Sequence, residues 1–288
     1  MIVILGPTAS GKTDLGIKLA KERNGAVISA DSRQLYKGMN IGTAKPELNN
    51  SSADGVEHYG FDMREPDNLI TLAEWQREAF AMIDDVIARN MTPLLVGGTM
   101  LYIDSVVDNY DIPAVGPNKQ LRRKLEKKPA DELYEELLRK DPAAKIFIEP
   151  GNKRRIIRAL EVIEATGNPF SEQRKKREPR YDVEMVGLFP GWDKLRDRIT
   201  KRARQMLEAG LIDETRRLQE KYGKDLSLLQ TMNYKQAAAV LENKMTEQEA
   251  VEEMIKVNMR YARRQMSWWR RRKDIRWFTN SKSVFSEY

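Results

Sequence analysis

Residues 6–13 read Gly6-Pro7-Thr8-Ala9-Ser10-Gly11-Lys12-Thr13, directly after the apolar run 2–5. This order of glycine, lysine and hydroxyl residues is that of a phosphate-binding loop between a strand and a helix. The glycines let backbone N–H groups turn toward a phosphate, and the following helix directs its positive dipole end at the same point. Lys12 supplies a positive charge, and Thr13 can place its hydroxyl on Mg²⁺. The loop is therefore predicted to bind a phosphorylated ligand together with Mg²⁺.

The residues around this loop alternate between short apolar runs and helical stretches. Apolar runs at 2–5, 26–30, 58–63 and 93–96 each end in a turn that contains glycine or aspartate. The best helix signal between them is a capping-box spacing that begins at Thr71. Strands that alternate with helices form parallel sheets. The sequence thus predicts an α/β fold of the P-loop NTPase-like class, with a parallel sheet flanked by helices.

The strand signal disappears after Pro113 and returns at 183–189. Charged helical patterns replace it, at 121–128, 130–139 and 152–166. We interpret this region as an inserted all-helical domain. The expected bounds are 117–184 for the insertion and 1–116 with 185–288 for the P-loop catalytic core domain. A short apolar run at 275–278 predicts an additional edge strand.

The composition excludes several classes of protein. The chain has no cysteine, so disulfides, thiolate metal sites and cysteine nucleophiles are absent. No apolar run approaches the roughly 20 residues that a membrane span needs. The first residues show no basic leader and no cleavage site. We expect a monomeric, cytoplasmic protein without a membrane partner.

Positive charge is concentrated in parts of the chain. Lys and Arg number 50 against 43 Asp and Glu, which gives a net charge of +7. Within 256–276, nine basic residues accompany a single acid, Asp274, and further basic clusters occur at 122–124 and 153–158. Solvated helix faces also carry such clusters. Several together favour a polyanion, such as nucleic acid, as a partner.

Two turns at the predicted strand ends add chemical groups beside the loop. Asp31 follows the run 26–30, and Thr99 follows Gly97-Gly98. Ligands of open parallel sheets bind at this edge. A carboxylate there can accept a proton or hold magnesium, and it can also be a simple turn former. These residues leave open nucleotide hydrolysis, phosphoryl transfer and a reaction that releases diphosphate. No apolar strand ends in the aspartate pattern of a motor ATPase, which weighs against hydrolysis.

Five longer segments of the sequence help to choose among these reactions. They are residues 28–46, 95–102, 154–161, 198–210 and 263–270. Together with the phosphate loop they resemble the tRNA dimethylallyltransferases, also called tRNA isopentenyltransferases, of the bacterial type. The resemblance implies transfer of a dimethylallyl group from dimethylallyl diphosphate to N6 of the adenosine immediately 3′ of the tRNA anticodon. It also implies that the loop binds the diphosphate of the prenyl donor instead of ATP. One position departs from the pattern, because Asn233 stands where the family usually has glycine.

This transfer gives the candidate residues distinct roles. An exocyclic adenine amine is a poor nucleophile, so a base that takes its proton would help by roughly 10² to 10⁴, and Asp31 is our candidate. Lys12, Thr13 with Mg²⁺ and the loop N–H groups would stabilise the departing diphosphate. Arg198 and Arg202 lie four residues apart on one helix face, and either could close over the phosphates. The predicted catalytic residues are Asp31, Thr13, Lys12 and Thr99, the last by the resemblance.

The RNA would have to present an unstacked base. An adenine stacked in an anticodon loop cannot reach such a pocket, so we expect it to be flipped out. Helical spacing lets Arg260 and Arg264 contact RNA phosphates, with Gln265 reading a neighbouring base. Trp268 and Trp269 are expected to pack in the core. The resemblance implies further contacts with tRNA at Asp31, Ser32, Arg33, Gln34, Thr99, Arg122, Arg154, Arg155, Ile156, Ile157 and Arg158.

Three alternative functions use the same loop. An adenylate isopentenyltransferase would prenylate free AMP, ADP or ATP, but the basic insertion and the arginine-rich final helix weigh against it. A small-molecule or nucleoside kinase would bind ATP on the loop and use Asp31 to activate a hydroxyl. A noncatalytic RNA-binding module would keep the loop without turnover. The identity of the reaction product separates the three from tRNA prenylation.

Overall fold

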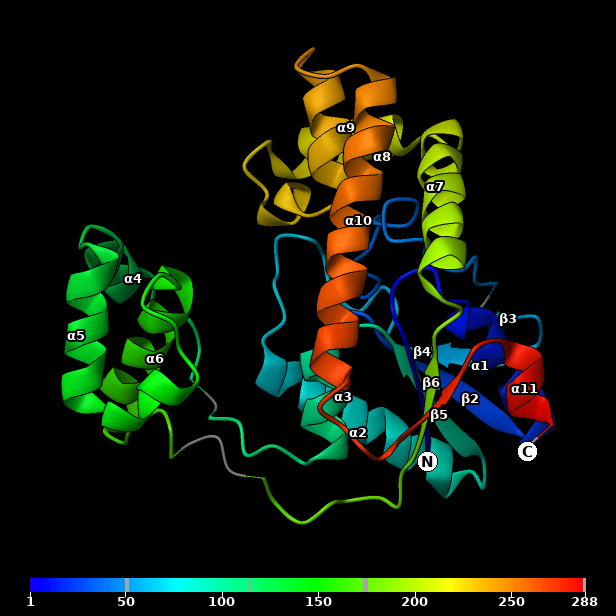
Figure 1. Cartoon of the computed structure of the whole chain (residues 1–288), viewed down its shortest axis with the longest axis horizontal. Helices are drawn as coiled ribbons and strands as arrows, with labels where there is room; N and C mark the ends of the chain where they lie inside the picture. The colour runs from blue at the N-terminus through cyan, green and yellow to red at the C-terminus, as the bar shows by residue number, and fades with distance from the viewer. Residues whose placement is uncertain (50–51, 114, 173–175, 287–288) are drawn as a thin grey trace. The chain divides into compact units, whose positions relative to one another are not determined.

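The computed structural model describes residues 1–49, 52–113, 115–172 and 176–286. The chain folds into two compact units (Figure 1). The first unit contains Met1–Ile70, Trp75–Val107 and Tyr181–Tyr288, and the second contains Thr71–Glu74 and Asp108–Arg180. The main segment of the second unit, Asp108–Arg180, therefore starts and ends earlier in the chain than the expected insertion, 117–184.

The bounds differ because the two ends of the insertion pair with each other. The N–H of Arg177 donates to the carbonyl oxygen of Asn109 at 3.0 Å, and the Asn109 side chain donates to the Glu178 carbonyl at 2.7 Å. Tyr110 and Lys176 form an isolated antiparallel bridge. The segment from Asp108 to residue 116 thus belongs with the helical unit. Hydropathy patterns do not reveal such a pairing of two polar segments.

A sheet of seven strands forms the centre of the first unit, in the order β3-β4-β2-β5-β1-β6-β7 among the described residues. The strands are β1 Ile2–Leu5, β2 Gly25–Ala30, β3 Ser52–Ala53, β4 Val56–Tyr59, β5 Thr92–Gly97, β6 Glu184–Leu188 and β7 Ile275–Phe278. All neighbouring pairs are parallel except β3 and β4. The predicted α/β fold with a parallel sheet and an edge strand at 275–278 is confirmed. Because β5 lies between β1 and β2, the loops after these three strands meet at one edge.

The strand predicted at 58–63 is present but lies earlier, because β4 covers Val56–Tyr59 and pairs in parallel with β2. β4 also forms an antiparallel hairpin with β3, which was not expected. The turn between them is Asp54-Gly55, whose φ angles are 51° and 77°. Two positive φ angles are typical of the two-residue hairpin turn that Asp-Gly favours. The sequence therefore does contain a hairpin signal here, in a region where alternating strands and helices were expected.

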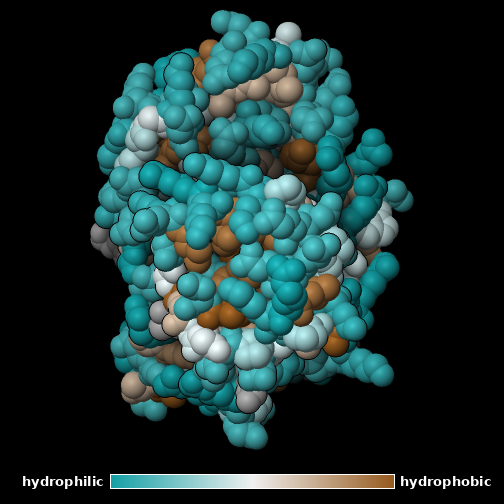
Figure 2. All heavy atoms as spheres, turned by 90° about the vertical axis from the view of Figure 1, so that its left-hand side faces the viewer, coloured by the Kyte–Doolittle hydropathy of each residue, from teal (hydrophilic) through white to brown (hydrophobic). Residues whose placement is uncertain are grey.

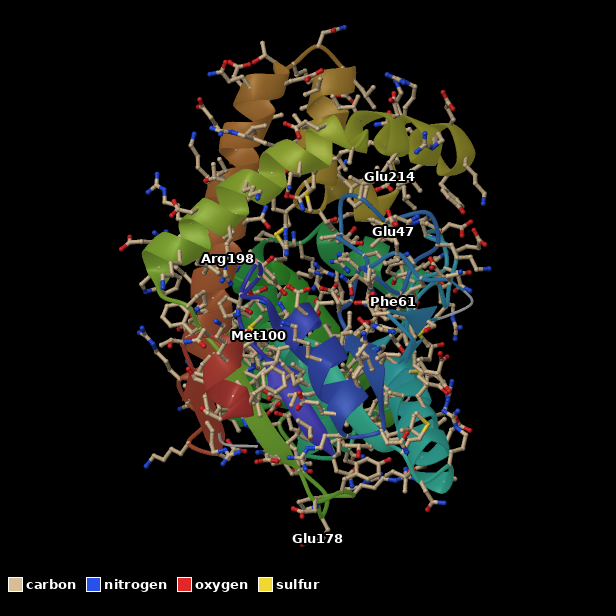
Figure 3. All side chains as sticks on the ribbon, turned by 90° about the vertical axis from the view of Figure 1, so that its right-hand side faces the viewer. Glu47, Phe61, Met100, Glu178, Arg198 and Glu214 are labelled. Atoms are coloured by element: carbon tan, nitrogen blue, oxygen red, sulfur yellow. The ribbon has the colours of Figure 1, made fainter. Side chains whose placement is uncertain are left out.

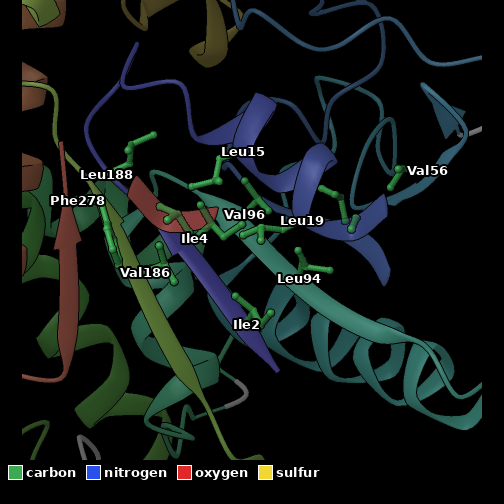
Figure 4. Close-up of a cluster of buried hydrophobic side chains, with 13 residues drawn as sticks. Ile2, Ile4, Leu15, Leu19, Val56, Leu94, Val96, Val186, Leu188 and Phe278 are labelled. Carbon is green, nitrogen blue, oxygen red and sulfur yellow. The ribbon is translucent and has the colours of Figure 1, made fainter. Parts of the chain in front are cut away.

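Helices accompany the sheet and bury its apolar strands. Leu15 and Leu19 lie one turn apart in α1 and pack against Ile4, Leu94 and Val186 of the strands (Figure 4). As expected, Trp269 is fully buried. The helices of this unit are α1 Lys12–Glu22, α3 Met100–Val107, α7 Trp192–Glu208, α8 Leu211–Tyr222, α9 Tyr234–Leu241, α10 Glu247–Trp269 and α11 Ser281–Phe285, and α2 runs Leu72–Ala88.

The second unit has a small helical core of its own. Its helices are α4 Lys119–Glu126, α5 Ala130–Lys140, a 3₁₀ helix at Pro142–Ile146, and α6 Lys153–Thr166. Leu125, Leu133 and Leu137 pack against the apolar face of α6. Ile156 and Ile157 lie on that face and are 0% and 6% exposed. The expectation that their side chains contact tRNA is therefore wrong, because they form part of the core.

The described chain contains no helix that is both long and apolar enough to cross a membrane. On the face that Figure 2 shows, hydrophilic side chains predominate, and hydrophobic ones form smaller areas between them. Exposed apolar side chains are ordinary on the surface of a folded protein.

Candidate active site

A cavity of about 570 Å³ opens at the carboxyl ends of β1, β2 and β5. Ligands of open parallel sheets bind at this edge because the loops after neighbouring strands form a crevice there. The cavity brings together groups that lie far apart in the sequence. Its lining includes Thr8, Ala9, Gly11, Lys12, Thr13, Asp31, Ser32, Arg33, Gln34, Gly98, Thr99, Arg202, Arg260, Arg264 and Gln265.

The phosphate loop is a backbone cradle that depends on a close approach. At Gly6 a Cβ atom would lie 2.4 Å from the carbonyl oxygen of Leu188, so a larger residue does not fit. The N–H of Ser10 donates to the carbonyl oxygen of Pro7 at 3.2 Å and closes the bend. The Ser10 hydroxyl is buried and has no hydrogen-bond partner among the described residues. Buried polar atoms are normally paired, so this hydroxyl fits a loop that receives a phosphate.

Lys12 and Arg202 are two partly buried cations of the cavity. Burial lowers the pKa of Lys12 to about 8, the charge of Arg202 acts in the same direction, and Asp31 opposes both. Burial is also the main cause that lowers the pKa of Arg202, while Asp14 and Asp31 oppose the shift. The ammonium of Lys12 donates to the Pro7 carbonyl at 3.2 Å. An anion bound between the two cations would stabilise both charged forms.

The side chains of Arg198 and Arg202 have different surroundings, although the two residues lie only one turn apart on α7. Nη1 of Arg198 donates to the carbonyl oxygen of Ser10 at 2.7 Å, and Figure 3 shows Arg198 beside the phosphate loop. Arg202 instead lines the cavity with Lys12. Arg198 therefore supports the loop backbone, whereas the Arg202 side chain faces the cavity. The sequence left this choice open.

Asp31 and Thr99 are held at neighbouring strand ends. Oγ1 of Thr99 accepts a hydrogen bond from the Ser32 N–H at 2.9 Å, and the Thr99 N–H donates to the Ala30 carbonyl at 3.1 Å. Oδ1 of Asp31 accepts from the Arg33 N–H at 2.9 Å. Oδ2 of Asp31 makes no hydrogen bond within the described residues. A fixed carboxylate with one available oxygen fits a proton acceptor.

The side-chain amide of Gln34 is hydrogen-bonded within the protein. Its Nε2 donates to the carbonyl oxygens of Thr43 and Ala44, both at 3.2 Å, and its Oε1 accepts from the Ser29 hydroxyl at 3.1 Å. Both amide ends are thus used within the protein. Gln34 therefore braces the loop that follows Asp31, and because it also lines the cavity, its expected contact with tRNA stays a prediction.

Glu214 is a second brace of this loop, and sequence reasoning did not identify it. Its buried carboxylate accepts hydrogen bonds from the N–H groups of Asn40, Ile41 and Gly42 at 2.9 to 3.1 Å. It also accepts from the Tyr234 hydroxyl at 2.7 Å, and Figure 3 shows Glu214 next to the loop. In the sequence Glu214 is one acid among many in a charged helix. No local signal marks it, because its partners in the loop lie more than 170 positions away.

The backbone at Asn233 has a conformation that suits glycine, the residue that the family usually has at this position. Its φ angle is 73°, a value that glycine adopts without strain. Its Nδ2 donates to the Gly42 carbonyl at 2.8 Å, and its Oδ1 accepts from Nδ2 of Asn258 at 2.8 Å. These two bonds join α10 to the loop after Asp31. Glycine could not make them.

The surroundings of Gln265 contradict its expected role. It is only 1% exposed, its Oε1 accepts from the Thr8 N–H at 2.9 Å, and its Nε2 donates to the Gly98 carbonyl at 2.7 Å. In this arrangement both ends of its amide are engaged within the protein, so it does not read a base. Arg260 and Arg264, by contrast, are exposed and line the cavity.

The described residues hold no group of three or more His, Cys, Asp or Glu that could bind a metal. Magnesium sites of phosphate-binding enzymes often use one or two protein groups and complete the shell with phosphate oxygens and water. The Thr13 hydroxyl lines the cavity. This oxygen donor fits a magnesium ion that takes its other ligands from a phosphorylated ligand and water.

Two family profiles match the chain. The IPP transferase profile matches residues 34–272, and the Isopentenyl transferase profile matches residues 1–64. The chain belongs to the IPP transferase family. The family resemblance inferred from the sequence is thereby confirmed.

Relatives of this IPP transferase match it over nearly its whole length. The tRNA dimethylallyltransferase of Anoxybacillus flavithermus is 40% identical over 280 residues, covering 96% of this chain and 89% of the relative. The tRNA dimethylallyltransferase of Prochlorococcus marinus is 38% identical over 284 residues, covering 99% of this chain and 94% of the relative.

Solved structures agree with this assignment. The full-length tRNA isopentenylpyrophosphate transferase of Bacillus halodurans superimposes with a TM-score of 0.72 at 36% identity, covering 99% of this chain and 93% of the other. A eukaryotic dimethylallyltransferase acting on tRNA gives a TM-score of 0.80 at 28% identity, covering 93% and 69%. The P-loop NTPase-like fold predicted for this IPP transferase is shared by these neighbours.

In the helical unit of this IPP transferase, two of the expected RNA contacts surround a buried acid. Glu161 has a side chain only 1% exposed and accepts from Arg122 at 2.8 Å and from Arg158 at 3.1 Å. These hydrogen bonds lower the pKa of Glu161, although its burial acts in the opposite direction and is the largest single cause. Arg154 and Arg155 are exposed instead. Arg122 and Arg158 thus hold a buried acid within the unit, and the tRNA contacts expected of them, as of Arg154 and Arg155, stay predictions.

Proposed function

We propose that this protein transfers a dimethylallyl group from dimethylallyl diphosphate to N6 of the adenosine immediately 3′ of the anticodon of tRNA. One observation carries the proposal: a cationic phosphate loop and a carboxylate with an available oxygen face the same cavity. The first suits a diphosphate ester and the second suits an amine that must lose a proton. The full-length relatives named tRNA dimethylallyltransferase favour this reaction over prenylation of free adenylate.

On the donor side, the protein would stabilise the leaving group. The C–O bond between the allylic carbon and diphosphate breaks, and negative charge grows on the diphosphate. Lys12, Arg202 and the N–H groups of the loop would bind that charge. Magnesium bound through Thr13 would add charge neutralisation. The loop therefore acts on diphosphate as a leaving group and has no need to cleave a phosphoanhydride.

On the acceptor side, a C–N bond forms between the same carbon and N6 of the adenosine. As this bond forms, an N6 proton passes to Oδ2 of Asp31, while Oδ1 stays bonded to the Arg33 N–H. Thr99 holds the strand end beside Asp31 through Ser32. A base that takes the proton during attack supplies roughly 10² to 10⁴ in rate.

The adenosine reaches the cavity after leaving its stack in the anticodon loop. Arg260 and Arg264 at the cavity, and Arg154 and Arg155 on the helical unit, would bind the phosphates of the anticodon stem-loop. We further propose that the protein acts as a monomer in the cytoplasm, where its substrate tRNA is found.

The test is the product itself. The protein is incubated with dimethylallyl diphosphate, Mg²⁺ and an anticodon stem-loop that carries adenosine at the target position, and the nucleosides are analysed by mass spectrometry. We expect N6-dimethylallyladenosine from the stem-loop and none from a matched stem-loop with guanosine at that position. Prenylation of free AMP at a comparable rate would support the adenylate enzyme instead. Phosphate transfer from ATP to a small molecule would support the kinase.

A further inference from the structure

Gln265 spans two parts of the cavity that serve different substrates. Its Oε1 is bonded to the N–H of Thr8 in the phosphate loop, and its Nε2 is bonded to the carbonyl oxygen of Gly98, the residue before Thr99. The first bond lies on the donor side and the second on the acceptor side. One planar amide thus joins the two walls from α10, across more than 160 positions of sequence.

The approach of the amide to Gly98 depends on the absence of a side chain there. A Cβ atom at position 98 would lie 2.5 Å from Nε2 of Gln265 and 3.5 Å from Cε of Lys12. The first distance is far below van der Waals contact, whereas the second is an ordinary one. Gly98 therefore allows the amide to sit directly against the backbone, next to the lysine that binds phosphate.

Other contacts also hold this end of α10. Near the same end of α10, Nε1 of Trp268 donates to Oδ2 of Asp104 at 2.6 Å, and Arg272 forms an ion pair with Asp104 at 3.1 Å. Trp269 is fully buried. These interactions anchor the helix to α3, so the two bonds of Gln265 have a separate consequence, which is to fix the loop relative to the strand end.

We propose that Gln265 is a positioning residue for prenyl transfer. It sets the spacing between the phosphate loop, which binds the donor, and the strand end at Gly98 and Thr99, which faces the acceptor. This inference rests on the proposed function. Its amide touches neither substrate and acts through the Thr8 N–H and the Gly98 carbonyl. Displacement of reacting atoms by about 1 Å can cost roughly 10²-fold in rate. Removal of either bond would therefore slow the chemical step while each substrate still binds to its own wall.

The decisive measurement is single-turnover prenylation with saturating protein. Gln265→Met keeps the volume of the side chain and removes both hydrogen bonds. We expect the rate to fall about 100-fold, with the Kd values for dimethylallyl diphosphate and for the stem-loop each changed by less than about threefold. Trp268→Phe is the matched control, because it removes an anchor of the same helix without touching either wall. It should lower Tm and leave the single-turnover rate unchanged.

A second variant displaces the Gln265 amide by a change at its partner, Gly98. Gly98→Ala leaves Gln265 in the chain but forces its amide away from the backbone, so it should show the same fall in rate with retained binding. An unchanged single-turnover rate in either variant would overturn the proposal. A fall in rate that depends on the base next to the target adenosine would overturn it as well, because it would mean that Gln265 reads that base. Wild-type protein that makes no prenylated adenosine would instead refute the proposed function.

Discussion

Arg198 donates a hydrogen bond of 2.7 Å to the carbonyl oxygen of Ser10, whereas Arg202, one turn later, lines the cavity beside Lys12. The two arginines should therefore differ when they are replaced. We expect Arg202→Gln to weaken binding of dimethylallyl diphosphate by about 10- to 100-fold, since a hydrogen bond to a charged group is worth about 1.5–3 kcal/mol. Arg198→Gln should cost less affinity and lower Tm. Titration calorimetry and thermal unfolding test both, and equal decreases in affinity would contradict this division.

Lys12 should make donor binding depend on pH. Its pKa is lowered to about 8 in the free protein, and a bound diphosphate would raise it again. Below pH 8 the ammonium is already charged, so the Kd should be constant. Above pH 8 the protein must take up a proton to bind, so the Kd should rise by up to about tenfold per pH unit. Lys12→Gln should bind weakly and show no such rise, and a wild-type Kd that stays flat to about pH 9.5 would contradict the assignment.

Asp31→Asn is nearly isosteric and keeps the oxygen that accepts from the Arg33 N–H. If Asp31 is the base, turnover should fall by about 10²- to 10⁴-fold, with little change in the Kd for dimethylallyl diphosphate. Rapid-quench kinetics and equilibrium binding measure the two quantities on the same preparation. A comparable decrease in both would show that Asp31 mainly supports the donor site.

Arg154 and Arg155 should act through RNA phosphates. Replacing both with glutamine should weaken binding of the stem-loop and reduce the slope of log K against log salt by about 0.7 to 0.9 for each phosphate that is no longer neutralised. Arg139→Gln, at an exposed site of α5, serves as a charge control and should leave the slope unchanged. Fluorescence anisotropy over a salt series gives both slopes. A double variant with the wild-type slope would remove this pair from the interface.

Asn233 combines a backbone angle that suits glycine with two side-chain hydrogen bonds. Asn233→Gly removes the bonds and relaxes the backbone, so these effects should largely offset each other. Asn233→Ala removes the bonds and keeps the unfavourable φ, which should make it less stable than the glycine variant by about 1–3 kcal/mol. Urea unfolding measures the difference. An alanine variant as stable as the glycine variant would mean that the backbone changes its conformation here.

Much of the fold was predictable because its signals are local. The central strands β1, β2 and β5 are short, largely apolar runs, and the phosphate loop is contiguous between a strand and a helix. The helices of the second unit likewise follow from charge and periodicity. The errors concern short or paired polar segments. The hairpin at Asp54-Gly55 and the pairing of Asn109 with Arg177 carry little hydrophobic pattern.

The sequence by itself determined which groups are available: a loop with Lys12 and Thr13, a carboxylate at Asp31, a hydroxyl at Thr99 and many arginines. Only the tertiary structure decided which of them face the ligand and which hold the others in place. Gln265, Glu214 and Arg198 have partners more than 170 positions away in the chain. The physical reason is that hydrogen bonds require approach within about 3 Å, and packing of the helices against the sheet, which no local pattern encodes, creates that approach.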